Sequence, residues 1–340
     1  MTPHGRASAR GERAKVSADG PVPAMSPLVL ALAFAAALVA AHPSVAAAQS
    51  AAAGVVVDAV GPPWSGARHA GLQPGDVVTR WALPGADAAG EHAITGLADW
   101  MEAEAEYGGT VEGLRLTVAR GGAIQTTTLA GGAWMVTAGP VLDPLLAPDH
   151  ARALALEARG DQAAAGDVWQ DLARRTATRD EALAAWFSYR AGGAALAARN
   201  AAVAEARYAA AREGAARTGQ VWLERDALDG LARALQASQR AAEAVAAREA
   251  AVTLMRARRP DSPTFVRTLA ALAQHQRDFG RLEDADRTFR EAREIATRTA
   301  AGTTAETAAL GGLSTVVRRR GDLAAADALL AEAGAIIDRF

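Results

Sequence analysis

The histidines are the side chains best suited to acid–base catalysis or metal binding, and their spacing supports neither role. Beyond the N-terminal segment they are His69, His92, His150 and His275, and none has a second histidine four residues later, as a zinc-binding helix requires. The sequence also lacks cysteine, a G-x-S-x-G nucleophile turn and a phosphate-binding loop. We therefore expect no catalytic residues, no metal site, no cofactor and no enzymatic activity.

Charge and composition limit the class of partner as well. The 340 residues include 36 basic and 38 acidic side chains, which gives a formal net charge of -2. A protein that binds nucleic acid needs a basic face to neutralise phosphates, so we expect no nucleic acid partner. Half of the residues are hydrophobic but only 5% are aromatic. The abundant alanine favours helices that pack closely on one another.

The first 48 residues have the three-part pattern of a secretory signal peptide. Arg10, Arg13 and Lys15 belong to a basic start, and an apolar run follows at residues 28–41. The run has 14 residues, fewer than the roughly 20 that a membrane-spanning helix needs. The segment predicts export to the periplasm or cell envelope after cleavage. The alternative is an inner-membrane anchor at residues 28–41, which would be the only membrane attachment. Met25 is an alternative start.

Residues 50–133 have the pattern of a small β-rich domain with one longer helix. β-Branched and aromatic residues favour strands, and glycine and proline mark turns. A glycine pair at Gly121-Gly122 predicts a hairpin turn. The expected strands cover residues 55–60, 114–118 and 124–129, with a further strand beginning at Val77 and a helix over residues 96–106.

The run Ala70-Gly71-Leu72-Gln73-Pro74-Gly75-Asp76 resembles the most recognisable stretch of PDZ domains of the bacterial envelope-protease type. The later helix and the hairpin stand where that family has them. The resemblance implies that a peptide binds by adding a strand to the sheet beside a helix. Only residues 49–54 remain for the strand and the carboxylate-binding loop that the family places earlier, so terminal carboxylate capture stays open. The implied groove residues are Val55, Val57, Leu97, Trp100 and Met101.

Residues 134–148 are predicted to be a linker, because Pro140, Pro144 and Pro148 interrupt any long helix or strand. Residues 149–340 then show helical periodicity and an internal repeat. The repeat recurs every 41 residues, with leucine at 231, 272 and 313. A turn position follows at 239, 280 and 321, and small alanines follow the turn. A single helical hairpin cannot bury such faces, so stacked hairpins are required.

This pattern resembles tetratricopeptide (TPR) repeats, in the lengthened form of kinesin light chain. The predicted fold is therefore multidomain: a small β-rich PDZ-like domain followed by an all-α TPR-like solenoid of about five hairpins. Such solenoids bind partners along the concave face, which the first helices of the hairpins line. Arginine on that face can clamp a carboxylate with paired donors. The residues placed there are Arg233, Gln274, Arg277, Thr315 and Arg318.

These features favour a non-catalytic adaptor or scaffold in the cell envelope that binds proteins or peptides. Linking two weak binding domains would raise the effective affinity for one partner. One alternative is a regulatory or substrate-delivery subunit of an envelope protease. Another is the N-terminal part of a longer PDZ–TPR protein that carries a catalytic domain.

Overall fold

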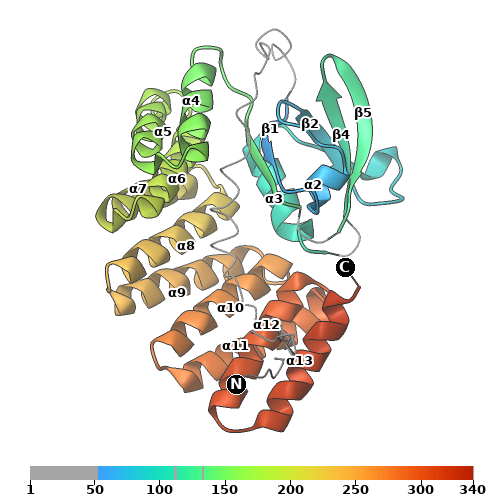
Figure 1. Cartoon of the computed structure of the whole chain (residues 1–340), viewed down its shortest axis with the longest axis vertical. Coiled ribbons are helices and arrows are strands. Elements are labelled where there is room, and N and C mark those ends of the chain that lie inside the picture. The colour runs from blue at the N-terminus through green and yellow to red at the C-terminus, as the bar shows by residue number, and fades with distance from the viewer. Residues whose placement is uncertain (1–52, 111–112, 132–133, 340) are drawn as a thin grey trace, which may run out of the picture.

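The computed structural model describes residues 53–110, 113–131 and 134–339. The predicted signal segment, residues 1–48, lies outside the described residues. Figure 1 shows two parts: an N-terminal sheet region (residues 53–140) and a curved helical region (residues 147–337) that bends around one side of it. Across the described ranges, no helix is both long enough and apolar enough to cross a membrane.

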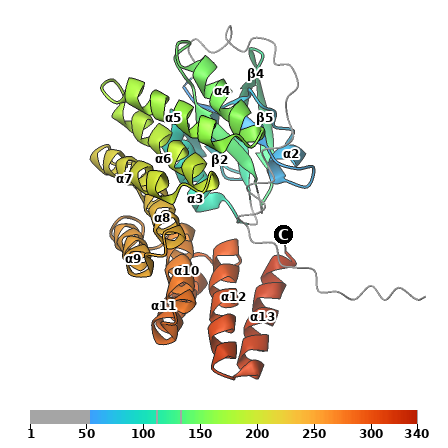
Figure 2. The same cartoon turned by 60° about the vertical axis from the view of Figure 1, so that its left-hand side comes forward.

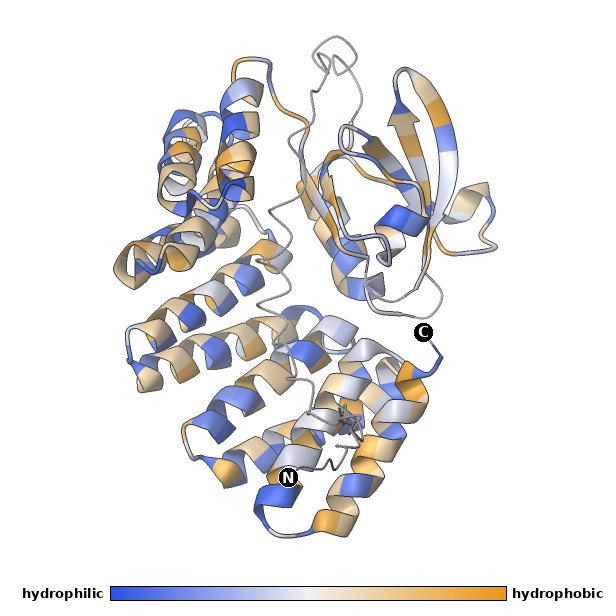
Figure 3. Cartoon of the chain, in the orientation of Figure 1, coloured by the Kyte–Doolittle hydropathy of each residue, from blue (hydrophilic) through white to orange (hydrophobic). Residues whose placement is uncertain are grey.

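The sheet region is a six-stranded antiparallel sheet with the strand order β5-β4-β2-β1-β6, and the short β3 pairs with β2. In Figure 3, hydrophobic and hydrophilic residues alternate along β4, as expected for a strand with one buried face. The elements are β1 (Val55–Val60), α2 (Gly66–His69), β2 (Val77–Ala82), η3 (Ala88–Gly90), β3 (Glu91–Ala93), α3 (Leu97–Tyr107), β4 (Leu114–Arg120), β5 (Ala123–Leu129) and β6 (Val136–Pro140).

The strands, hairpin turn and longer helix expected from residues 55–129 are confirmed. The buried Asp76 fixes the turn before β2, because it accepts the Gln73 backbone N–H at 2.8 Å and the Arg120 Nε–H at 2.6 Å. This pairing ties the Gln73–Asp76 turn to the far end of β4. It explains why a carboxylate stands beside a glycine turn in an otherwise apolar core.

The predicted linker differs from the structure, because residues 136–140 form the edge strand β6 beside β1. Val136 pairs with Val60, and Pro140 pairs with Val55 at the other end of the ladder. A proline is tolerated in an edge strand, where its missing N–H costs no ladder hydrogen bond. The prolines that suggested a linker are therefore compatible with a strand at this position.

The helical region consists of five consecutive antiparallel hairpins within the described residues, and each helix packs on its neighbours in sequence. In Figure 2, α12 and α13 form the end of the helical region farthest from α4. The helices are α4 (Ala147–Ala158), α5 (Gln162–Thr176), α6 (Glu181–Ala197), α7 (Ala201–Arg217), α8 (Val221–Ala237), α9 (Ala241–Arg258), α10 (Pro263–Asp278), α11 (Leu282–Thr299), α12 (Thr304–Arg319) and α13 (Leu323–Ile337).

The turn inside each hairpin has a residue in the left-handed backbone region, as the repeat predicted. Glycine adopts this conformation without steric cost, and it does so in three of the five turns. The five residues are Gly160, Arg199, Gln239, Gly280 and Gly321, with φ values of 80°, 60°, 60°, 79° and 90°.

The repeated apolar positions form the core between the hairpins. Leu272 and Leu313 are buried, and so are Ala285 and Ala292 of the following helix α11. Position 248 breaks the pattern, because a buried arginine stands where α7 and α11 have the buried aromatic residues Tyr208 and Phe289. Arg248 lies against Asp229 of α8, which compensates its charge.

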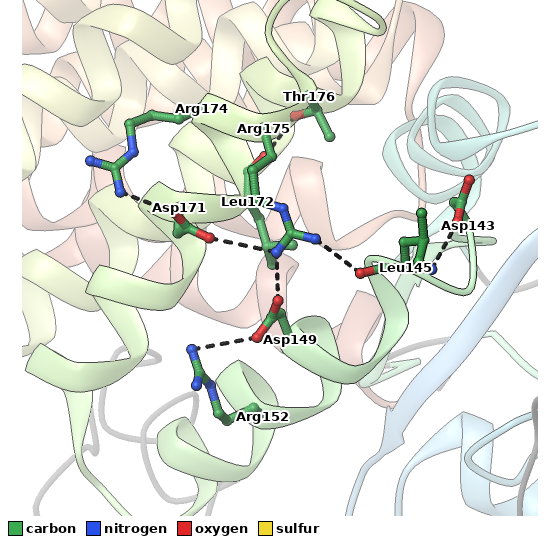
Figure 4. A network of polar contacts seen from close by, with 9 residues as sticks. All are labelled: Asp143, Leu145, Asp149, Arg152, Asp171, Leu172, Arg174, Arg175 and Thr176. Carbon is green, nitrogen blue, oxygen red and sulfur yellow. Dashed lines mark hydrogen bonds and ion pairs between the residues drawn. The ribbon is translucent and has the colours of Figure 1, made fainter.

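A polar network holds the connection between β6 and α4 against the helical region (Figure 4). Arg175 of α5 donates to the Leu145 carbonyl at 2.9 Å and to the Asp149 carboxylate of α4. Asp143 accepts the Leu145 backbone N–H at 2.8 Å. The end of this six-residue connection next to α4 is thus held against α5.

Candidate binding site between the sheet region and the helical region

Helix α3 of the sheet region docks on the first helices of two hairpins, α8 and α10. Met101 and Ala105 of α3 belong to the same apolar cluster as Trp222 of α8 and Val266 of α10. Helix α3 therefore has two apolar sides. Trp100 and Ala103 form the other side, which packs into the core of the sheet region. The chain therefore covers part of its own first-helix surface.

Polar groups fix the C-terminal end of α3 in this interface. The last carbonyls of a helix lack partners within the helix, and the Ala105 carbonyl accepts hydrogen bonds from Thr264 Oγ1, at 2.6 Å, and from Arg267. The Thr304 backbone N–H donates to the Gly109 carbonyl at 3.0 Å. A guanidinium at a helix C-terminus is also favoured by the helix dipole. Burial lowers the pKa of Arg267 to about 10, which leaves it charged at neutral pH.

A buried acid–histidine pair forms a second contact between the two parts. Asp58 of β1 and His150 of α4 lie 3.6 Å apart, from Oδ2 to Nε2, and neither atom has a hydrogen-bond partner among the described residues. Burial raises the pKa of Asp58 to about 7 and lowers the pKa of His150 to about 3. Both side chains are therefore neutral at mildly acidic pH. A side chain at Gly139 of β6 would overlap the Asp58 carboxylate.

Two cavities flank α3. The Trp81 cavity, about 560 Å³, lies between the sheet region and the start of α10. The Trp222 cavity, about 500 Å³, lies between α3 and the helices α8, α10 and α12. Asp99, Glu102 and Glu106 border the first cavity, whereas Met101 and Glu104 border the second. Helix α3 thus presents different chemistry on its two sides.

Burial and charge in the Trp222 cavity make one acid weaker than usual. Glu104 is exposed as a whole, but protein atoms around its carboxylate withhold hydration and the nearby Asp226 carboxylate repels it, and both effects raise the pKa of Glu104. Asp226 is paired with Arg225 at 2.7 Å. No arginine of the described residues lies within ion-pair distance of Glu104, although Trp100 hydrogen-bonds to it. Arg225 and Arg267 of the same lining offset part of this effect, because each favours the charged form of Glu104.

No protein-family model matches the sequence, and no curated protein is similar to it. Comparison of structures finds RapI in its apo form, with 11% identity and a TM-score of 0.51, over 59% of this chain and 56% of RapI. BtubC from P. vanneervenii has 15% identity and a TM-score of 0.49, over 57% of this chain and 80% of BtubC. TPR-like repeats of the kinesin light chain type from Podosopora anserina have 20% identity and a TM-score of 0.47, over 56% of this chain and 94% of that protein.

The helical region is a TPR-like solenoid. The regular hairpins and their left-handed turns carry this assignment, and the similarity to RapI agrees with it at the level of fold. The preceding small antiparallel sheet makes the chain multidomain in architecture.

The structure separates the five residues predicted for the first-helix face of the TPR-like solenoid. Arg233 of α8 is half-buried near Tyr208 and Asp226. The other four lie on α10 and α12, which pack side by side. Gln274 and Arg318 are exposed, and Arg277 is half-buried beside Asp278. The Thr315 hydroxyl donates to a backbone carbonyl of its own helix.

The peptide groove expected around β1 is wrong. Val55, Val57 and Trp100 are buried in the core of the sheet region, and β1 is paired on both edges, with β2 and with β6. Leu97 and Met101 are half-buried against an apolar cluster of the first two hairpins of the TPR-like solenoid. The strand β6 occupies the edge at which a peptide could otherwise have been added to β1.

Sequence patterns did not indicate the polar residues of the interface. Asp58 offered the one available signal, a carboxylate inside a strand of valines, because a buried charge requires a partner. Thr264, Arg267 and Glu104 look like ordinary surface residues of amphipathic helices. Their roles come from contacts between segments that are far apart in the sequence.

Proposed function

We propose that this protein is a non-catalytic adaptor that binds an acidic peptide segment of a partner protein across α10 and α12. The observation that carries the proposal is the position of Arg277 and Arg318 on adjacent first helices, beyond the part of the surface that α3 covers. Within the described ranges, Arg318 forms no ion pair, and Arg277 pairs only with the neighbouring Asp278. Guanidinium groups in this arrangement can bind carboxylates with two parallel hydrogen bonds.

The helices that carry these arginines suit an extended peptide. Gly311 of α12 has open space where a side chain would begin, and Gln274 is exposed on α10. A peptide backbone can therefore approach the helices closely, while an amide side chain supplies hydrogen bonds. Because small and polar groups line this surface, it suits reversible binding of a peptide and not a permanent interface that buries a large apolar area.

Reversing both charges should abolish this binding without unfolding the chain. We expect acidic sequences to be enriched when a random 12-residue peptide library is selected on the whole protein. The variant Arg277→Glu/Arg318→Glu should bind a selected peptide at least tenfold more weakly in fluorescence anisotropy. The matched control is Arg287→Glu/Arg298→Glu, which reverses two exposed arginines of α11. Equal loss in both variants, or selected peptides without acidic enrichment, would exclude this binding surface.

Export to the cell envelope is a second part of the proposal, and the support is the signal-like pattern of residues 1–48. When residues 1–60 are fused to a reporter enzyme that is active only outside the cytoplasm, we expect activity. Replacing Leu32 and Leu38 by arginine should remove that activity, because charges prevent insertion of the apolar run. Activity that persists in this variant would contradict export through this segment.

A further inference from the structure

Helix α13 carries large apolar side chains on a face that the described residues leave open. The helix lies at the far end of the helical region and packs mainly on α12 (Figure 2). Leu323, Leu330 and Ile337 remain 62%, 41% and 59% exposed. Because they recur every seven residues, they lie along one side of the helix. We call these three residues the α13 stripe.

The equivalent positions of the preceding hairpin are buried. Leu330 stands 41 residues after Phe289 of α11, and Ile337 stands 41 residues after Ala296. Phe289 and Ala296 are both fully buried. The first helix of the next hairpin covers Phe289, because Gly312 of α12 lies directly against its ring. The repeat therefore indicates that a further helix packs on the α13 stripe.

The spacing of the stripe suits the same helix of a second copy. A contact around a two-fold axis requires a surface that is complementary to itself. In an antiparallel pair with Leu330 on the axis, Leu330 meets the partner's Leu330, and Leu323 meets the partner's Ile337. Asp327, an acid beside the stripe, then faces the partner's Gly334. The two copies of this acid stay apart, so the pairing brings no like charges together.

We propose that the α13 stripe is an interface between two copies of this chain, in which the α13 helices pack antiparallel about a two-fold axis at Leu330. Removing the leucine and isoleucine side chains from water favours the association. The contact is made by a different helix from α10 and α12, so it does not depend on the proposed adaptor function.

Sedimentation equilibrium of the whole protein tests the proposal. We expect dimers at about 100 µM, well above a roughly micromolar dissociation constant for a small specific interface. Leu330→Glu should weaken the dimer at least tenfold, because it places two carboxylates face to face on the axis. The matched control is Val203→Glu, which changes a side chain of α7 that is 39% exposed and should leave the dimer unchanged. A monomeric wild-type protein, or an equal effect of both variants, would overturn the proposal.

Single cysteines test the geometry, because the chain has no cysteine of its own. Leu330→Cys should give a disulfide-linked dimer on mild oxidation, since the two copies of residue 330 meet on the axis. Leu323→Cys lies about 10 Å from the axis along the helix and should not. Disulfides in both variants would contradict the antiparallel arrangement. No disulfide from Leu330→Cys would contradict the contact itself, and this result remains decisive if Leu330→Glu folds poorly.

Discussion

Replacing Asp58 by asparagine or His150 by phenylalanine should shift the pH dependence of stability in opposite directions. Asp58 is an acid whose pKa is raised from 3.8 to about 7 by burial, so its contribution is present at acidic pH and is lost as pH rises toward 7. His150 is a base whose pKa is lowered from 6.5 to about 3 by burial, so its contribution is present above 6.5 and is lost as pH falls toward 3.

The wild-type pair should therefore be nearly insensitive to pH between about 4 and 6.5. In that range the folded pair holds one proton, on Asp58, and the unfolded pair also holds one, on His150. Relative to wild type, Asp58→Asn should gain stability as pH rises from 4 to 7, and His150→Phe should gain stability as pH falls from 6.5 to 4. Since one pKa unit corresponds to about 1.4 kcal/mol, each change amounts to roughly 3–4 kcal/mol.

Urea denaturation of the three proteins at pH 4, 5, 6 and 7 measures these differences directly. Differences from wild type cancel the contributions of other titrating groups. The double variant Asp58→Asn/His150→Phe is the matched control, because removing both groups restores a profile parallel to wild type across this range. Parallel profiles in both single variants would mean that neither group is held neutral by burial.

Two adjacent glycines of α12 should respond in opposite ways to the same added methyl group. A methyl at Gly312 would overlap the ring of Phe289 on α11, whereas a methyl at Gly311 would meet open space. Gly311→Ala should stabilise the protein by about 0.5–1 kcal/mol, because alanine loses less backbone freedom in a helix. Gly312→Ala should destabilise it by about 1–3 kcal/mol, because the helices must separate.

Thermal unfolding monitored by circular dichroism compares the two alanine variants with wild type. The change in melting temperature of Gly312→Ala then measures the energetic cost of moving α11 and α12 apart. Gly311→Ala is the control for the effect of alanine itself. Equal shifts of both midpoints would mean that Gly312 does not set the distance between these helices. Gly311→Ser and Gly312→Ser repeat the comparison with a polar side chain. Serine is a suitable choice because α12 already has a buried serine, Ser314, at a neighbouring position.

Much of the fold follows from local sequence patterns, and the interface does not. Leucine at 272 and 313 and glycine at 280 and 321 mark burial and left-handed turns, which depend on nearby residues alone. Position 248 was a poor fit to the repeat because its burial depends on an acid from another helix, Asp229. Sequence periodicity reports which face of a helix is apolar, but not which distant polar group satisfies a buried charge.

The candidate sites show the same division. Gln274 and Arg318 were placed on exposed first-helix positions by the repeat spacing, and the structure leaves them exposed. The groove around β1 was misplaced because β6 ends at Pro140 in a proline-rich stretch that resembles a linker, and edge strands have weak local signals. The Trp222 cavity could not be predicted, since its lining comes from α3, α8, α10 and the loop before β6.

The contact between α3 and α10 also imposes an order on biosynthesis. Thr264 reaches the Ala105 carbonyl across 159 positions of the chain, and a ribosome adds about 5–20 residues per second. A nascent α3 therefore emerges about 8–32 s before its docking helix has been translated. During that interval Met101 and Ala105 lack the apolar partners that α10 provides, so this side of α3 is open to non-native contacts until translation passes α10.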